Sequence, residues 1–196
     1  MFLETICIKN GIVQHIEAHK ERMRKTAAHF GFHAPELPDL SSQLPDELID
    51  KKVKCSITYH ENITNIVFSE YVARKIRSLK LVESDINYTF KFSDRLALNT
   101  LLDKKGNADE ILIVQNNCIT DTTFSNVVFQ RGNTFFTPDT YLLNGTKRQK
   151  LLQKKKIEET RITVDDLSTF NTVFLVNAML DIEDQKGISI SNIKPM

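Results

Sequence analysis

The stretch over residues 90–148 constrains the fold most, because its sequence pattern changes from that of a helix to that of paired strands over a short length of chain. Leucines at positions 98, 101 and 102 have helical spacing, and an apolar strand is expected over residues 111–114. Asn116-Asn117 then predicts a turn, and a second strand is expected over residues 118–130. The stretch therefore predicts short helices and hairpins within a mixed α+β structure.

The rest of the chain continues this pattern. Asn10-Gly11 predicts a hairpin turn, because both residues tolerate a positive φ. A helix is expected from Ile16, with its apolar face formed by Ile16, Met23, Ala27 and Phe30, and Gly31 is expected as its C-cap. Further strands are expected at 2–8, 53–59, 63–72, 75–82, 134–136 and 172–178. The polar run at 84–87 predicts a linker, so we expect one small domain over residues 1–84 and a second over residues 85–196.

The overall composition excludes several classes of partner. The chain has 196 residues, of which 41% are apolar and 26% are charged, and this is ordinary for a globular protein. A formal net charge of +1 gives no global field that would recruit nucleic acid or an anionic membrane. No run of 18 apolar residues predicts a transmembrane helix, and the N-terminus lacks the apolar stretch of a secretory signal. We therefore expect a cytoplasmic protein.

The cysteines and histidines predict neither a disulfide framework nor a metal site. Cys7, Cys55 and Cys118 are far apart and lie among strand-like residues, as expected for reduced, buried thiols. His15 and His19 are four residues apart on the expected helix, but no third ligand accompanies them.

A series of short motifs gives the strongest indication of function. Each motif is weak alone, but their order is specific: Phe2-Leu3-Glu4-Thr5, His19-x-x-Arg22-Met23, Lys91-x-x-x-Arg95-Leu96, Ala108-Asp109-Glu110, Asp121-x-x-x-Ser125-Asn126, Thr137-Pro138, Leu143-x-Gly145-x-x-Arg148 and Phe174-x-x-Asn177-Ala178. In these motifs the chain resembles the class IV aminotransferases, the fold type IV enzymes of pyridoxal 5'-phosphate. The resemblance implies two small α/β domains with the cofactor between them, and a homodimer.

The resemblance also implies which residues contact the cofactor ring. Lys91 would form the Schiff base with the cofactor and would then act as the general base at the substrate carbon. Asp121 stands where the family usually has glutamate, the acid that keeps the pyridine nitrogen protonated. Ser125 and Asn126 would form hydrogen bonds near the ring.

A second group of matched residues would hold the cofactor phosphate. Arg22 matches the family arginine that binds it by a charge-assisted contact. The turn at Gly145, Thr146 and Lys147 would supply backbone N–H groups at a helix start, although the family usually has threonine where this chain has Lys147. Asn177-Ala178 would form the other loop on the phosphate side.

The details of two motifs favour one reaction. Asn177-Ala178 and Lys91-x-x-x-Arg95-Leu96 are more similar to 4-amino-4-deoxychorismate lyase than to the transaminases. The resemblance thus implies a lyase of folate biosynthesis that acts on a small-molecule amine and forms 4-aminobenzoate and pyruvate, with Arg95 a candidate ligand of the substrate carboxylates. Two alternatives stay open: an aminotransferase that acts on branched-chain or D-amino acids, and a pyridoxal phosphate-binding homologue with weakened catalysis.

Overall fold

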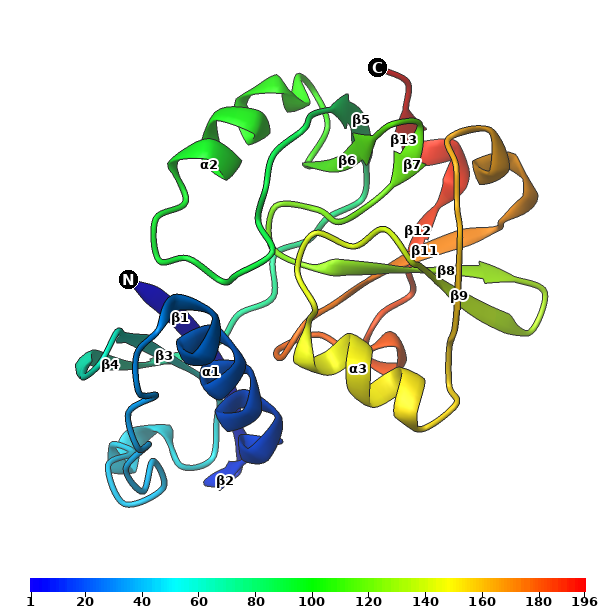
Figure 1. Cartoon of the computed structure of the whole chain (residues 1–196). Coiled ribbons are helices and arrows are strands. Elements are labelled where there is room, and N and C mark those ends of the chain that lie inside the picture. The colour runs from blue at the N-terminus through cyan, green and yellow to red at the C-terminus, as the bar shows by residue number, and fades with distance from the viewer. The chain divides into compact units, whose positions relative to one another are not determined.

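The computed structural model describes residues 1–196, which form two compact units. The first unit contains residues 1–73 and 90–94, and the second contains residues 74–89 and 95–196. Figure 1 labels their elements. Each unit is described on its own.

The first unit is an antiparallel sheet with one long helix. The strand order is β2-β1-β3-β4. Its elements are β1 (Phe2–Lys9), β2 (Ile12–Val13), α1 (Ile16–Phe30), the 3-10 turn η1 (Asp46–Leu48), β3 (Lys52–Tyr59) and β4 (Ile63–Glu70). The predicted hairpin turn is confirmed, since Asn10 and Gly11 have φ values of 51° and 72°. The predicted C-cap is also confirmed, because Gly31 ends α1 with a φ of 73°.

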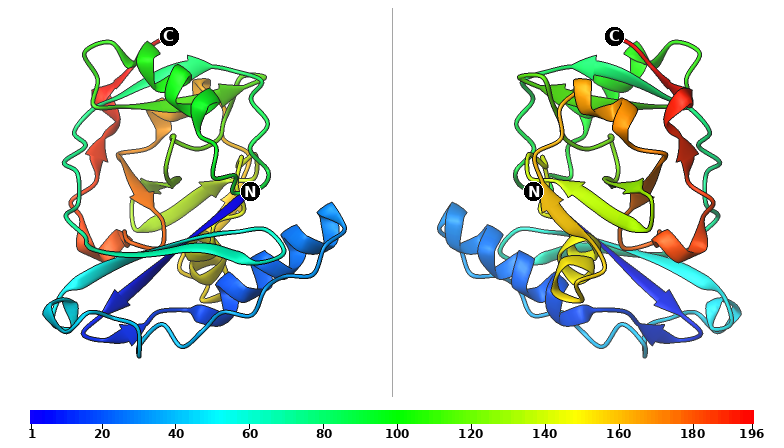
Figure 2. Two further views of the ribbon diagram at one scale, coloured as in Figure 1. Left: turned by 90° about the vertical axis from the view of Figure 1, so that its left-hand side faces the viewer. Right: turned by 90° about the vertical axis from the view of Figure 1, so that its right-hand side faces the viewer.

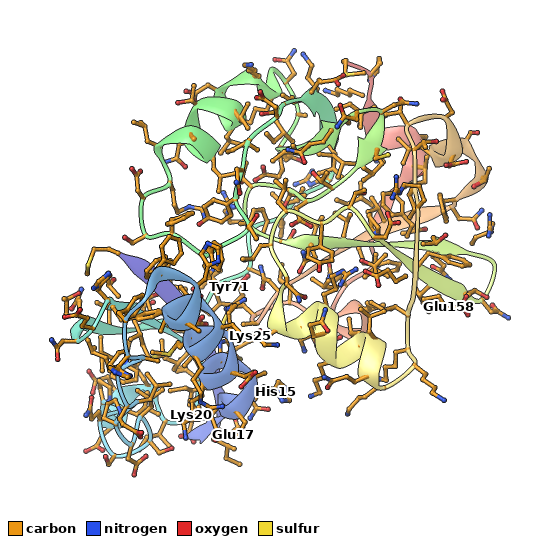
Figure 3. The ribbon with its side chains drawn as sticks, viewed as in Figure 1. His15, Glu17, Lys20, Lys25, Tyr71 and Glu158 are labelled. Atoms are coloured by element: carbon orange, nitrogen blue, oxygen red, sulfur yellow. The ribbon has the colours of Figure 1, made fainter.

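The core of this unit follows the period of each element. In β3 every second residue is buried, from Val53 to Tyr59, as expected for a strand with one face on the core. The helix α1 buries Met23 and Ala27, as predicted. Phe30 does not belong to the buried face: it is the last residue of α1 and is 44% exposed, with its ring against that of Phe90. The opposite face is polar, and Glu17, Lys20 and Lys25 can be followed along α1 in Figure 3.

The second unit contains two sheets. Their strand orders are β10-β9-β8-β11-β12 and β13-β5-β6-β7. The strands are β5 (Leu79–Glu83), β6 (Glu110–Gln115), β7 (Cys118–Ile119), β8 (Asn126–Arg131), β9 (Thr134–Pro138), β10 (Glu158–Thr160), β11 (Thr172–Val176), β12 (Ile188–Ser189) and β13 (Ile193–Lys194). The helices are α2 (Leu96–Leu102), α3 (Thr146–Gln153) and the 3-10 turns η2 (Asp103–Lys105), η3 (Asp165–Thr169), η4 (Ile182–Asp184) and η5 (Ile190–Asn192).

One hydrophobic core joins these two sheets. Leu112 and Val114 of β6 lie in the same buried cluster as Phe129 of β8 and Leu175 of β11. Beside it, α3 packs against the larger sheet through Leu151, which clusters with Val128 and Val176, and Figure 2 shows two side views of this helix. The continuous apolar run of β11 is buried on both faces, as its sequence predicts.

The expected strand over residues 118–130 is wrong in its middle. The chain leaves β7 at Ile119 and enters β8 only at Asn126, and residues 120–125 form a loop. Thr122 causes the interruption, because its N–H donates to the Ser125 carbonyl at 2.9 Å and its hydroxyl accepts from the Ser125 N–H at 3.0 Å. Such local bonds compete with a sheet ladder. This segment is called the ring loop below.

The division into units differs from the boundary expected between residues 84 and 85. The strand β5 belongs to the second unit, because it pairs in parallel with β6. Residues 90–94 return to the first unit, where the Leu3 N–H donates to the Lys91 carbonyl at 2.9 Å and Phe2 bridges Phe92. Each of these short segments therefore belongs to the unit whose strand it is hydrogen-bonded to.

Candidate active site

Lys91 lies in the first unit, on a segment that is held by its backbone. Its carbonyl accepts the hydrogen bond from Leu3, and its side chain is half-buried. The flanking residues Phe90 and Phe92 have their ring centroids 6.4 Å apart, within the aromatic cluster around Phe2. The backbone position of the candidate lysine is thus fixed by β1 and by its aromatic neighbours.

Arg22 also lies in the first unit, where it meets a buried acid. Its Nε donates to Glu4 Oε1 at 2.8 Å and its Nη2 donates to Glu4 Oε2 at 2.6 Å. His19 Nδ1 lies 2.6 Å from the same Oε2 atom. Burial alone would raise the pKa of Glu4, but the charge of Arg22 and the hydrogen bonds from Arg22 and His19 outweigh it and lower the pKa to about 2. Glu4 is therefore ionised at neutral pH.

Asp121 lies in the ring loop of the second unit and is 4% exposed. Its Oδ2 accepts the backbone N–H groups of Leu142 and Leu143 at 3.0 and 2.9 Å, and its Oδ1 accepts the Asn126 amide at 2.8 Å. Burial raises the pKa of Asp121 to about 6, and these hydrogen bonds offset only part of that effect. A positive charge beside this carboxylate would favour its ionised form.

Asn126 connects Asp121 to the turn before α3. Its amide nitrogen donates both to Asp121 and to the Leu143 carbonyl, each at 2.8 Å. A Cβ on Gly145 would lie 2.0 Å from Asn126 Oδ1, which is closer than any real Cβ contact. The φ of Gly145 is −71°, which any residue can adopt. Glycine is therefore needed here for space, because the Asn126 side chain lies against the backbone. The structure thus brings Asp121, Asn126 and Gly145 together.

Thr146 and Lys147 begin α3, and Gly145 is its N-cap. The first N–H groups of a helix have no partner within it, so this end favours an anion. The Lys147 side chain lies here too, but its Nζ donates to Asp181 Oδ2 at 2.6 Å. Asp181 follows the loop of Asn177 and Ala178, so this ion pair connects the two segments expected on the phosphate side.

Asn177 joins its own loop to the ring loop. Its amide nitrogen donates to the Phe124 carbonyl at 3.2 Å, while its oxygen accepts the N–H groups of Met179 and Leu180. Ala178 lies inside this turn and is half-buried. Ser125 serves the ring loop itself, because its hydroxyl lies 2.7 Å from that of Thr122.

Arg95 contacts the backbone of the ring loop. Its Nη2 donates to the Thr123 carbonyl at 2.6 Å, and the Thr123 hydroxyl donates to Glu110 Oε1 at 2.9 Å. Glu110 is fully buried, and the Nη2 atom of Arg74 lies 3.7 Å from its Oε2. The sequence motifs contain Glu4, His19 and Glu110 but indicate no role for them, and they do not include Asp181. The pairing partners of these side chains come from other elements, which no local pattern shows.

Each unit contains groups that suit part of a phosphorylated pyridine. In the second unit, the start of α3 suits a phosphate and the buried Asp121 carboxylate suits a protonated ring nitrogen. In the first unit, the Arg22 guanidinium suits a phosphate. The three cysteines are free thiols and are buried, as predicted. The structure contains no group of three or more His, Cys, Asp and Glu side chains that could hold a metal ion. None of its helices combines the length and apolar character needed to cross a membrane.

Known proteins resemble this chain over most of its length. The family model for amino-transferase class IV matches residues 1–184. An uncharacterised protein of Haemophilus influenzae Rd is 39% identical over 180 residues, which cover 90% of this chain and 96% of that protein.

Solved structures show the same fold. A protein from Haemophilus somnus 129PT, provisionally named a 4-amino-4-deoxychorismate lyase, is 35% identical, with a TM-score of 0.78 and coverage of 91% of this chain and 95% of that chain. A hypothetical aminotransferase from Mycobacterium tuberculosis, bound to α-ketoglutarate and pyridoxamine phosphate (PMP), is 18% identical, with a TM-score of 0.76 and coverage of 91% and 77%. At that identity the second likeness shows the fold alone.

Proposed function

The chain belongs to the class IV aminotransferase family of pyridoxal phosphate-dependent enzymes, and from this premise we propose that it is a lyase that converts 4-amino-4-deoxychorismate to 4-aminobenzoate and pyruvate. This reaction belongs to folate biosynthesis, and we place it in the cytoplasm, in a homodimer. The observation that carries the choice of a lyase is the 35% identity, over nearly the whole of both chains, to the protein of that provisional name. The Asn177-Ala178 and Lys91-x-x-x-Arg95 motifs support the same choice.

In this proposal the phosphate is bound by Arg22 and by the backbone N–H groups of Gly145, Thr146 and Lys147. The guanidinium would form charge-assisted hydrogen bonds, and the helix start would add its partial positive charge. Lys147 would bring a second full charge, which Asp181 partly neutralises at 2.6 Å. Asn177 would act through the ring loop, because its amide holds the Phe124 carbonyl.

Asp121 would keep a proton on the pyridine nitrogen. When bound, the cofactor supplies an electron sink for the bond-breaking step at the substrate. The carboxylate of Asp121 is already oriented by Asn126 and by the backbone at 142–143, so it would need little reorganisation to pair with the ring. Ser125 would keep the ring loop in shape through its bonds to Thr122.

Lys91 would move the proton that the reaction requires. Its amine would take the proton from the substrate carbon that bears the amino group, and the carbon–oxygen bond to the enolpyruvyl group would then break. The ring becomes aromatic, and the released enol takes up a proton to become pyruvate. No keto acid is consumed, whereas an aminotransferase needs one. Arg95 would support the backbone of the ring loop, because its Nη2 donates a hydrogen bond to the Thr123 carbonyl. Binding of the substrate carboxylates would therefore not be its only role.

The cofactor part of the proposal is tested by the visible absorption of the purified protein with added pyridoxal phosphate. The protein is expected to show a visible band, and borohydride reduction with peptide mapping is expected to label Lys91. Lys91→Ala should lose the band, whereas Lys104→Ala, at an exposed lysine of η2, should keep it. A band that persists in Lys91→Ala would contradict the assignment of this lysine.

The reaction is tested by product analysis. Incubation with 4-amino-4-deoxychorismate alone should give equal amounts of 4-aminobenzoate and pyruvate. A new amino acid that forms only with an added keto acid would identify an aminotransferase instead. A coloured protein that forms neither product would be a binding homologue with weakened catalysis.

A further inference from the structure

Residues from two motifs near the start of the chain contact one buried carboxylate, that of Glu4. The proposed binding of the cofactor assigns no role to this carboxylate. Glu4 of β1 is completely buried, and it accepts two hydrogen bonds from Arg22 and one from His19, both on α1. We propose that Glu4 and His19 are positioning residues, which hold the guanidinium of Arg22 in one orientation for the cofactor phosphate. This inference rests on the proposed function, in which Arg22 binds that phosphate.

The geometry of the contact fixes the guanidinium. Glu4 binds the edge formed by Nε and Nη2, at 2.8 and 2.6 Å, and the guanidinium is planar, so this contact sets both the plane and the direction of the group. The edge that carries Nη1 must therefore point away from Glu4. The side chain of Glu4 is 1% exposed and that of Arg22 is 15% exposed, so the carboxylate lies behind the arginine and the arginine reaches the surface of its unit.

His19 fixes the carboxylate in turn. Glu4 is ionised, so its oxygens can only accept, and the Nδ1 atom of His19 must carry the proton in their 2.6 Å contact. His19 and Arg22 are three residues apart, so they project from the same face of α1. This face is locked against the core by Met23 and Ala27, which are 1% and 2% exposed. A preorganised cation loses less entropy when it binds an anion.

A purely structural role makes a different prediction. If the cluster only holds α1 on β1, its loss should weaken every ligand of the protein alike. If it positions Arg22, its loss should weaken only ligands that carry the phosphate. Pyridoxal lacks the phosphate but keeps the ring and the aldehyde, so the ratio of the two affinities separates the roles.

The experiment measures the affinities of the cofactor-free, full-length protein for pyridoxal phosphate and for pyridoxal by spectroscopic titration. Glu4→Gln keeps the shape of the side chain but places an amide donor against the donors of Arg22 and His19. We expect it to weaken pyridoxal phosphate about tenfold, as expected when one oriented charge-assisted contact is lost, with pyridoxal unchanged. His19→Gln should weaken pyridoxal phosphate less, but with the same selectivity.

Tyr59→Phe is the matched control. Tyr59 is 1% exposed, and burial and the charge of Glu4 raise its pKa to about 12, so it lies in the same core. Its substitution should change neither affinity. Glu4→Asp provides a second variant if Glu4→Gln does not fold, because it keeps the charge and only shortens the reach. It should lower the same ratio.

The inference would be overturned if Glu4→Gln and Glu4→Asp left the ratio of the two affinities unchanged, whether both affinities fell equally or neither fell. Arg22→Ala distinguishes this failure from that of the proposed function. If Arg22→Ala lowers the ratio but the Glu4 variants do not, Arg22 binds the phosphate without help from Glu4. If Arg22→Ala leaves the ratio unchanged, or if the unmodified protein binds neither ligand, the assignment of Arg22 itself is wrong.

Discussion

Asp121 is one methylene shorter than the glutamate that the family usually has, and its contacts show how the chain accommodates it. The backbone of residues 142–143 donates both of its N–H groups to one carboxylate oxygen, and Asn126 donates to the other. An ionised carboxylate offers about four acceptor sites, so these three bonds leave one for a protonated ring nitrogen. The shorter acid is thus a buried, hydrogen-bonded part of the ring loop.

Restoring the family residue should therefore harm this protein. Asp121→Glu adds a methylene to a buried side chain and moves the carboxylate off its backbone donors, so we expect a loss of about 1–3 kcal/mol in the free energy of unfolding. Urea unfolding of the cofactor-free protein measures it. Asp103→Glu, on the exposed turn η2, is the control and should be neutral. A variant as stable as the parent would show that the loop adjusts freely.

Glu4 should make the free energy of unfolding depend on pH in the acidic range. Its pKa falls from 4.5 to about 2 on folding, so the folded state binds fewer protons than the unfolded state between these values. Stability from Glu4 is complete above pH 4.5 and is lost as the pH falls toward 2, by roughly 3 kcal/mol. Unfolding measured from pH 5 to pH 2 should show this slope, and Glu4→Gln should lack it. Parallel curves would contradict the ionisation of Glu4.

At the scale of elements, the ring loop and the start of α3 behave as one piece. Asn126 at the start of β8 contacts Asp121, Leu143 and the backbone of Gly145 together. We expect Gly145→Ala to displace the Asn126 amide and to weaken pyridoxal phosphate binding severalfold, with about 1–3 kcal/mol of stability lost. Because φ of Gly145 suits any residue, the collision alone is responsible.

A double-mutant cycle measures that collision. In an Asn126→Ala background the obstacle is absent, so adding Gly145→Ala should cost less than it does in the parent. Unfolding free energies of the four proteins give the coupling. Additive losses would show that the glycine serves another purpose. Gly132→Ala is not a useful control, because its φ of 58° strains any other residue.

Most elements could be predicted from the sequence, but the loop that carries the site could not. Alternation predicted β3, and the Asn10-Gly11 turn and the Gly31 cap follow from residue chemistry. Residues 120–125 look like strand, because their threonines favour strands, yet the bonds between Thr122 and Ser125 form the loop instead. The motif order identified the candidate residues. Their partners, such as Asp181 for Lys147, depend on tertiary packing.

At the scale of the whole molecule, the chain alternates between its units rather than dividing once. Residues 74–89 belong to the second unit and residues 90–94 to the first, before the chain enters the second unit again at residue 95. The polar run at 84–87 predicted a domain boundary because it resembles a linker. The hydrogen bonds of each segment to neighbouring strands instead determine the unit to which it belongs. The buried side chains of Leu79 and Leu81 place β5 with β6.

This division predicts how fragments behave. A chain of residues 85–196 lacks β5 and leaves an edge of β6 and part of its core uncovered, so we expect no cooperative unfolding and a tendency to aggregate. A chain of residues 74–196 keeps β5 and should unfold cooperatively. Circular dichroism during thermal unfolding compares the two. Equal cooperativity would show that β5 is dispensable.

The path of the chain also sets an order for folding during synthesis. The N–H of Leu3 in β1 cannot form its hydrogen bond until Lys91 has been synthesised. Lys91 leaves the ribosome long after Leu3, and after β5 has already emerged. Domains tend to fold as their last residues emerge. The first unit is therefore finished only once the candidate lysine has been made, so a nascent chain stalled before residue 90 carries an incomplete first unit.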